Sequence, residues 1–289
     1  MYAPTGQVDL CYQTFGDPTD PPLLLVMGLG APLNWWPLSL CRALAQAGFF
    51  VIRFDNRDAG RSSTCHAPIG LRHVVRAFAT GTGAPPYTLN DMADDAAALL
   101  DRLGLASAHV VGASMGGMIA QTMALAHPDR VDSLTSIMST TGRRTVGWQH
   151  PSVLAHLISP RPTSLEAYVA HTFTVSQTIG SPGFPTSIDE HRQRAEETWR
   201  RGVEPAGAAR QMLAILRQPD RTLALRTLAV PTLVIHGTDD RMVHVSGGRA
   251  TASAVPGAEL LLIDGMGHDL PAALHATFTD AISRVAARA

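Results

Sequence analysis

The stretch Gly112-Ala113-Ser114-Met115-Gly116 decides the fold that we expect, because it places a serine between two glycines. The valine-rich run 109–111 precedes it, and the run 117–126, typical of a helix, follows. A nucleophile elbow requires this order of strand, sharp turn and helix, since the glycines permit a tight turn that exposes the serine Oγ atom above a sheet. With 25 glycines in the chain the bare pattern can arise by chance, so the surrounding elements must support it.

Short apolar runs on both sides of the elbow predict further strands, and helical patterns alternate with them. The segment 88–91 carries a capping signal for one of these helices. Such alternation favours an α/β fold, a doubly wound, mostly parallel sheet with helices on both faces. The predicted strands are 23–27, 49–54, 109–111, 133–138, 232–237 and 259–264, and the predicted helices are 36–46, 92–103, 117–126 and 271–287.

The alternation breaks between residues 141 and 227. Prolines interrupt short helical segments there, such as 190–200 and 206–216, and strand-like runs are few. We predict a helical cap, or lid, at 141–227, inserted into one α/β core that comprises 1–140 and 228–289. Most apolar and aromatic residues of the cap are expected to form its own core.

Composition excludes several classes of partner. The chain has 289 residues, 45% of them hydrophobic and 16% charged, which is typical of a globular protein with a substantial core. A formal net charge of -1 provides no long-range field to attract nucleic acid or an anionic membrane. The three cysteines lack the spacing of a zinc site or a disulfide framework, so no metal is predicted.

No membrane-spanning segment is expected either. The uncharged stretches 21–41 and 110–126 contain prolines or glycines, which suits buried strand-turn-helix units better than a transmembrane helix. The first residues lack a basic region followed by an apolar one, so we expect a cytoplasmic location. No heptad pattern or self-complementary stripe indicates an oligomeric state, which stays open.

A catalytic serine needs a base, because its hydroxyl is a poor nucleophile near neutral pH, and the base needs a third group to orient it. On a doubly wound sheet the expected chain order is serine, acid, histidine. Of the 12 histidines, His268 follows a late predicted strand through the glycine-rich approach 265–267. Because the carboxyl ends of parallel strands meet at one edge of the sheet, we predict Ser114 as the nucleophile and His268 as the base.

Two neighbouring aspartates compete for the role of the acid. Asp239 and Asp240 both follow the strand that ends at Gly237. A carboxylate three residues beyond that glycine has room to reach back to the Nδ1 atom of His268, which favours Asp240. Asp239 is expected to be a solvated turn residue and stays the alternative acid.

An acyl-transfer site also needs two N–H donors for the developing oxyanion. One is expected from the residue after the nucleophile, Met115, and the other from the loop that follows an early strand. The loop Gly28-Leu29-Gly30 follows the strand 23–27, so we predict the backbone amides of Leu29 and Met115. A simple glycine turn is the alternative for this loop.

A further glycine-containing turn spans 55–62. Its carboxylates and arginines invite an interpretation as an acid–base site, but it offers no histidine. We expect a structural turn held by hydrogen bonds.

Together these motifs resemble those of the α/β-hydrolase superfamily. The chain is similar in particular to carboxylesterases of the mycobacterial Lip type and to the aclacinomycin methylesterase of anthracycline tailoring. It departs from the wider superfamily at Met27, often histidine there, and at Asp58, often glycine. The motifs that carry the resemblance are Gly28-Leu29-Gly30, Asp55-x-Arg57-x-x-Gly60-x-Ser62, the segment 111–121 around Ser114, Asp240 and His268.

The resemblance and the motifs together predict a serine hydrolase that cleaves carboxylic esters through an acyl-enzyme. The expected partner is a small-molecule ester of small to medium size and apolar character, and no metal or organic cofactor is expected. The cap is expected to cover the pocket, with Gly28, Trp35, Trp36 and Met138 as substrate contacts, although core packing explains these side chains equally well.

Two alternatives stay open. The same three residues serve perhydrolase, thioesterase or carbon–carbon hydrolase chemistry on related proteins. A ligand-binding receptor on a hydrolase fold is the second alternative. A dehalogenase or epoxide hydrolase is disfavoured, because those members resemble this chain except for an aspartate at the elbow.

Overall fold

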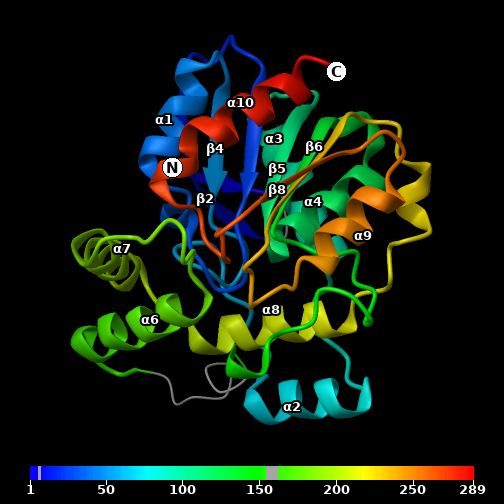
Figure 1. Ribbon diagram of the computed structural model, residues 1–289. Helices are drawn as coiled ribbons and strands as arrows, with labels where there is room; N and C mark the ends of the chain where they lie inside the picture. Colours follow the sequence, from blue (N-terminus) through cyan, green and yellow to red (C-terminus); the bar gives the residue numbers. More distant parts are fainter. Residues whose placement is uncertain (6–7, 154–161) are drawn as a thin grey trace.

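The computed structural model describes residues 1–5, 8–153 and 162–289. Its centre is an eight-stranded sheet in the order β1-β2-β4-β3-β5-β6-β7-β8 (Figure 1). The first two strands are antiparallel to their neighbours and the other six run parallel, so the predicted α/β class is confirmed. The strands are β1 Tyr2–Pro4, β2 Asp9–Phe15, β3 Pro22–Val26, β4 Phe50–Phe54, β5 Ala108–Ala113, β6 Val131–Ile137, β7 Thr232–Gly237 and β8 Glu259–Ile263.

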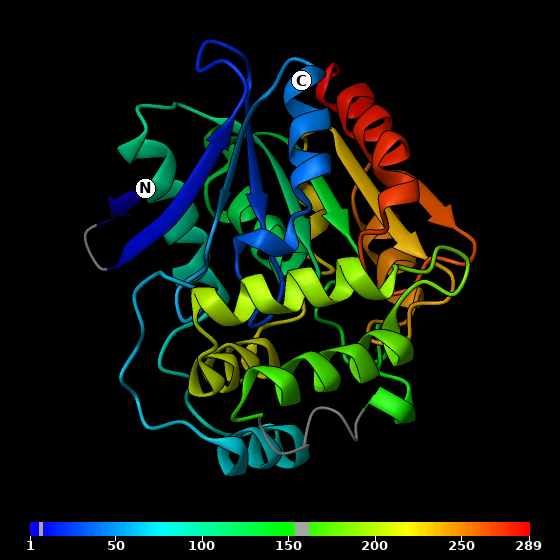
Figure 2. The same cartoon turned by 90° about the vertical axis from the view of Figure 1, so that its left-hand side faces the viewer.

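Helices cover both faces of this sheet. Helices α1 (Leu38–Gln46) and α10 (His275–Ala286) lie side by side on one face, in front of the strands in Figure 2. Helices α3 (Leu89–Arg102), α4 (Met115–Ala126) and α9 (Ser246–Ala254) cover the other face. The central strands are therefore buried on both faces, which explains why they read as continuous apolar runs rather than alternating ones.

Local signals account for the helix limits. The side chain of Thr88 accepts a hydrogen bond from the amide of Asp91, whose carboxylate accepts one from the Thr88 amide. This capping box starts α3 at Leu89. The predicted helix 36–46 begins later, at Leu38, because Pro37 is its N-cap, and the short 3₁₀ helix Leu33–Trp35 precedes it.

Three helices of the predicted cap follow β6 in the chain: α6 (Leu165–Ile179), α7 (Ile188–Arg201) and α8 (Pro205–Arg217). They lie across the end of the sheet toward which the parallel strands point (Figure 1). Helix α2 (Leu71–Thr80), which the sequence patterns did not predict, packs against α8 although it precedes β5 in the chain. The helical layer over the sheet therefore draws on two separate segments of the sequence.

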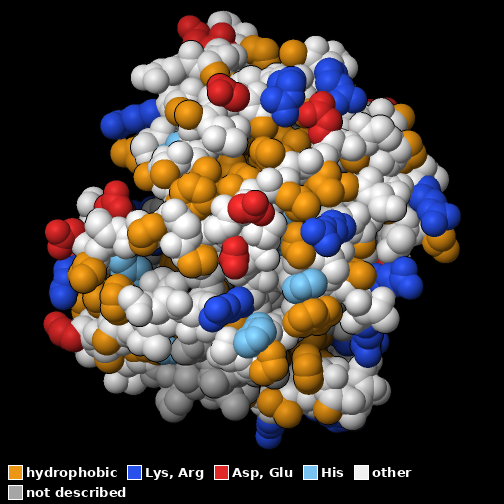
Figure 3. All heavy atoms as spheres, viewed as in Figure 1, with side chains coloured by type: hydrophobic (Ala, Val, Ile, Leu, Met, Phe, Trp, Pro, Cys, Tyr) orange, Lys and Arg blue, Asp and Glu red, His pale blue; other side chains and the backbone are white. Residues whose placement is uncertain are grey.

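The surface carries no dominant charge on the face shown in Figure 3, where acidic and basic side chains are interspersed with apolar ones. This distribution matches the formal net charge of -1. Within the described ranges, none of the helices has the length and apolar character needed to cross a membrane.

Candidate active site

The elbow places Ser114 between β5 and α4 in a conformation that side chains rarely adopt. Its φ angle is +57°, a positive value that costs a non-glycine residue roughly 1–3 kcal/mol and that is typical of functional sites. The flanking glycines are required by close approach. A Cβ atom at Gly112 would lie 2.1 Å from the carbonyl oxygen of Gly116, and one at Gly116 would lie 1.9 Å from that of Val26. Only glycine fits at either position.

The structure brings the three predicted catalytic side chains together at the carboxyl ends of β5, β7 and β8. The Oγ atom of Ser114 lies 2.9 Å from Nε2 of His268. The Nδ1 atom of His268 lies 2.7 Å from Oδ2 of Asp240. A carboxylate on Nδ1 fixes the imidazole tautomer that leaves Nε2 free to accept the serine proton.

The two candidate acids occupy different surroundings. Asp239 accepts hydrogen bonds from the amide of Gly265 and the hydroxyl of Thr238, and does not contact the imidazole. Asp240 is 3% exposed, and its Oδ1 accepts hydrogen bonds from the amides of Met242 and Val243. Asp240 is thus the carboxylate that orients His268, and Asp239 is a turn residue.

Asp240 stays ionised despite its burial. Burial alone raises the pKa of a carboxyl group, but the neighbouring His268 and His236 outweigh this effect and hold the pKa of Asp240 at about 2. A negative charge at this point favours the protonated form of the neighbouring imidazole.

His236 is a residue of this site that the sequence patterns did not single out. It is fully buried in β7, and its Nε2 atom lies 2.8 Å from the carbonyl oxygen of Val243 and 3.4 Å from Oδ2 of Asp240. Both neighbours are acceptors, so Nε2 carries the hydrogen. The sequence did contain a signal for His236, because it is a polar residue inside the largely apolar strand Thr232–Gly237.

Two backbone amides border the serine hydroxyl. Met115 is the first residue of α4, and Leu29 follows Gly28, at which a Cβ atom would lie 3.6 Å from the Oγ atom of Ser114. Within the described parts of the chain, neither the Leu29 amide nor the Met115 amide donates a hydrogen bond. Free N–H groups beside a nucleophile, one of them at a helix N-terminus, suit a developing negative charge.

The cap holds the loop that carries Leu29. The side chain of Gln211 in α8 is fully buried; its Oε1 accepts a hydrogen bond of 2.7 Å from the amide of Gly30, and its Nε2 donates one of 2.7 Å to the carbonyl of Arg57. Gln211 lies far from this loop in the sequence, so no local pattern indicated its role.

The turn 55–62 is bonded to helices α7 and α8. Asp55 forms an ion pair of 2.6 Å with Arg201 at the end of α7. Asp58 receives two hydrogen bonds of 2.8 Å from the guanidinium of Arg210 in α8, and one of 2.6 Å from the hydroxyl of Tyr87. These carboxylates are engaged in structural bonds, as expected of a structural turn rather than an acid–base site.

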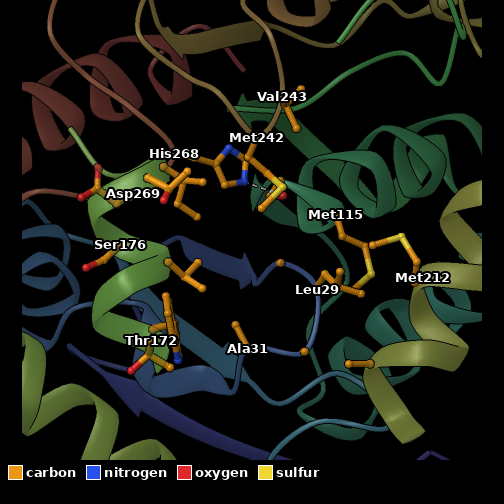
Figure 4. Close-up of a pocket in the computed structure, with 18 of the residues that line it drawn as sticks. Leu29, Ala31, Met115, Thr172, Ser176, Met212, Met242, Val243, His268 and Asp269 are labelled. Carbon is orange, nitrogen blue, oxygen red and sulfur yellow. Dashed lines mark hydrogen bonds between the residues drawn. The ribbon is translucent and has the colours of Figure 1, made fainter. Parts of the chain in front are cut away.

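A cavity of about 1430 Å³ lies between the sheet edge and the cap, and both Ser114 and His268 line it. One wall carries Thr172, Ser176 and Asp269, and the opposite wall carries Leu29, Met115 and Met212 (Figure 4). Helix α6 also contributes Phe173, Val175 and Ile179 to the lining, so the wall on this side is mixed in polarity and the wall near α8 is mainly apolar.

Three of the four predicted substrate contacts, Gly28, Trp35 and Met138, line this cavity. Trp36 does not. Its side chain is fully buried and packs in the core between the sheet and α1, so the expectation for Trp36 is corrected. The side chains of Trp35 and Trp36 point in different directions from the 3₁₀ turn. The sequence alone did not show which of the two reaches the cavity. Among the described residues, no cluster of histidine, cysteine or acidic side chains could hold a metal ion.

Comparison with known proteins places this fold and site in a family. The family model described as "alpha/beta hydrolase fold" matches residues 21–271. The chain therefore belongs to the α/β-hydrolase fold family, as its motifs predicted.

Its relatives include ester hydrolases. Rhodomycin D methylesterase DnrP of Streptomyces peucetius is 29% identical over 297 residues, which cover 96% of this chain and 94% of DnrP. Rhodomycin D methylesterase DauP of Streptomyces sp. (strain C5) is 30% identical over 300 residues, with the same coverage of both chains. The predicted resemblance to methylesterases and the predicted class of carboxylic ester hydrolase are confirmed.

A solved structure shares the architecture. The enol-lactonase from Burkholderia xenovorans LB400 superposes with a TM-score of 0.74 at 24% identity, covering 99% of each chain. At this identity the likeness shows the fold alone.

Proposed function

We propose that the protein cleaves carboxylic esters by nucleophilic catalysis at Ser114. The hydrogen bond of 2.9 Å between Ser114 Oγ and His268 Nε2 carries this proposal. The Oγ atom attacks the ester carbonyl carbon while its proton passes to His268. The amides of Leu29 and Met115 stabilise the oxyanion of the tetrahedral intermediate, and Asp240 stabilises the imidazolium.

Collapse of this intermediate breaks the bond between the carbonyl carbon and the alcohol oxygen. His268 returns its proton to the departing oxygen, which leaves as the alcohol and gives an acyl-enzyme on Ser114. A water molecule, deprotonated by His268, then attacks the acyl carbon; the bond between this carbon and Ser114 Oγ breaks, His268 returns the proton to Oγ, and the acid is released. No step requires a metal or an organic cofactor.

The cavity supports a larger ester than the sequence patterns suggested. Pockets for small molecules usually enclose roughly 300–1,000 Å³, whereas this one measures about 1430 Å³. The names of DnrP and DauP describe them as methylesterases that act on rhodomycin D. We infer that this chain also removes a small alcohol from a bulky acid, and that the described part of the segment 141–227 acts as the cap over it; residues 154–161 of that predicted cap lie outside the described residues.

Labelling and turnover test the proposal together. We expect the wild-type protein to hydrolyse p-nitrophenyl esters and to bind a fluorophosphonate probe covalently at Ser114. Replacement Ser114→Ala removes the attacking atom and should lower kcat/KM by about 10⁴-fold or more.

The matched control is Ser176→Ala, another cavity-lining serine, whose hydroxyl donates a hydrogen bond to the backbone carbonyl of Phe173 in its own helix and to no other described residue. This variant should keep both labelling and turnover. A wild-type protein without labelling or turnover would support the receptor alternative instead.

A further inference from the structure

Helix α7 carries a charged side chain on the face that packs inward. His191, Ala195 and Thr198 are buried at 5%, 3% and 2% exposure and define this face by their helical spacing. Arg194 lies on the same face, three residues after His191, and lines the cavity that contains Ser114. An inward position is normally apolar, so the arginine breaks the usual pattern of an amphipathic helix.

The guanidinium of Arg194 is held in place without a hydrogen-bonded partner. Its Cζ atom lies 5.2 Å from the ring centroid of Trp35, which also lines the cavity. Among the residues that the structure describes, none accepts a hydrogen bond from this guanidinium, and no carboxylate oxygen lies within 4.0 Å of its nitrogen atoms. The stacking contact orients the group while its N–H donors stay unused.

The acidic side chains nearest to Arg194 do not accept a hydrogen bond from its guanidinium either. Asp269 and Glu190 raise the pKa of Arg194 through space, but burial outweighs them and lowers it. The carboxylate of Asp269 accepts a hydrogen bond from Ser181 instead. Burial, together with the charge of Arg194, lowers the pKa of His191, so His191 is neutral near pH 7. Arg194 is thus the cation that this face of α7 presents to the cavity.

Arg194 is partly buried, and a cation that loses part of its hydration without gaining a hydrogen-bonded partner in the protein is unfavourable. A residue that departs from the usual local pattern, and that no contact within the protein compensates, indicates a functional position. The planar guanidinium offers parallel N–H donors that match the two oxygens of a carboxylate. A ligand carboxylate would supply the missing compensation.

We propose that Arg194 forms a subsite for a carboxylate carried by the substrate, so that the preferred esters are monoesters of dicarboxylic acids. The ester group lies at Ser114 and the free carboxylate at Arg194, within the same cavity. This inference rests on the proposed ester hydrolysis at Ser114, and it adds a substrate class to it.

Monomethyl esters of linear dicarboxylic acids, from succinate to sebacate, test the proposal against the matching dimethyl esters. We expect wild-type kcat/KM to favour the monoester by about 10- to 100-fold at one chain length, as a charged hydrogen bond in a cavity provides. Arg194→Met should remove this preference by raising KM for the monoester, with kcat and the dimethyl ester little changed. Arg194→Lys should retain part of it, since lysine keeps the charge without the planar fork.

The matched control is Arg192→Met, an exposed arginine on the same helix, which should leave the preference intact. Absence of a preference in the wild-type protein would overturn the proposal, and so would an equal loss for both esters in Arg194→Met, since that indicates only packing of α7 on Trp35.

The experiments distinguish failure of the proposed ester hydrolysis from failure of the carboxylate subsite. If neutral esters are cleaved in a Ser114-dependent way without discrimination, only the subsite is wrong. If no ester is cleaved, calorimetric titration of the Ser114→Ala protein with the dicarboxylates still decides: binding that Arg194→Met weakens supports the subsite, and absence of binding refutes it.

Discussion

The edge of the sheet and the junction between core and cap are both assembled from residues distant in the sequence, yet they differ in how their partners meet. At the edge, Ser114 and His268 lie 154 positions apart, and each follows a strand of one parallel sheet. At the junction, Asp58 and Arg210 lie 152 positions apart, and they meet only because α8 docks in one orientation. A sheet imposes a common edge, whereas helix docking depends on the packing of whole surfaces.

The two regions are expected to fail in different ways. Loss of a group at the sheet edge should abolish chemistry in a protein that still folds. Loss of a group at the junction should destabilise the protein or displace the cap, and should affect chemistry only indirectly. Three substitutions test this contrast.

The largest effect is expected at the edge. Asp240→Asn should lower kcat by about 10³- to 10⁴-fold, because the amide no longer holds His268 in the correct tautomer or stabilises its positive form. Steady-state kinetics with a p-nitrophenyl ester measures this loss. Asp239→Asn is the matched control and should stay within a few-fold of wild type. Comparable losses in both variants would contradict the assignment of Asp240.

The next effect concerns the junction. The side chains of Arg210 and Asp58 are 4% and 0% exposed, so Arg210→Met leaves a buried carboxylate without its cation. We expect a loss of about 3 kcal/mol in the free energy of unfolding, measured by chemical denaturation.

The control for this variant is Arg200→Met, which breaks the exposed ion pair with Glu196 on α7. Such a pair contributes about 0.5 kcal/mol or less. Equal effects of the two substitutions would show that the junction does not anchor the cap.

The smallest effect links the two regions. Gln211→Leu leaves the amide of Gly30 and the carbonyl of Arg57 without their partner and frees the loop that carries Leu29. We expect kcat to fall about tenfold, with a loss of roughly 1–2 kcal/mol in stability. The exposed Gln193→Leu on α7 is the control. A loss of stability with unchanged kcat would show that Gln211 does not influence catalysis through the loop that carries Leu29.

Much of the fold was predictable because its signals are local. The elbow 112–116, the capping box at Thr88 and the apolar runs of the parallel strands each depend on neighbouring residues. Strand β2 escaped prediction because only Leu10 and Cys11 in it are buried, while Asp9 is exposed and the rest are half-buried, which leaves no apolar run. Helix α2 was missed although it has a local signal, because Leu71, Val74, Val75 and Phe78 lie at helical spacing and line the cavity rather than the core.

The sequence by itself determined the class of fold, the elbow at Ser114 and the candidates for its partners, since a parallel sheet brings strand ends together whatever covers them. Tertiary structure alone decided that Trp35 lines the cavity while Trp36 lies in the core, that His236 lies beside Asp240, and that Gln211 bonds to the loop that carries Leu29. These outcomes depend on the direction of single side chains and on the docking of helices, which short-range patterns do not encode.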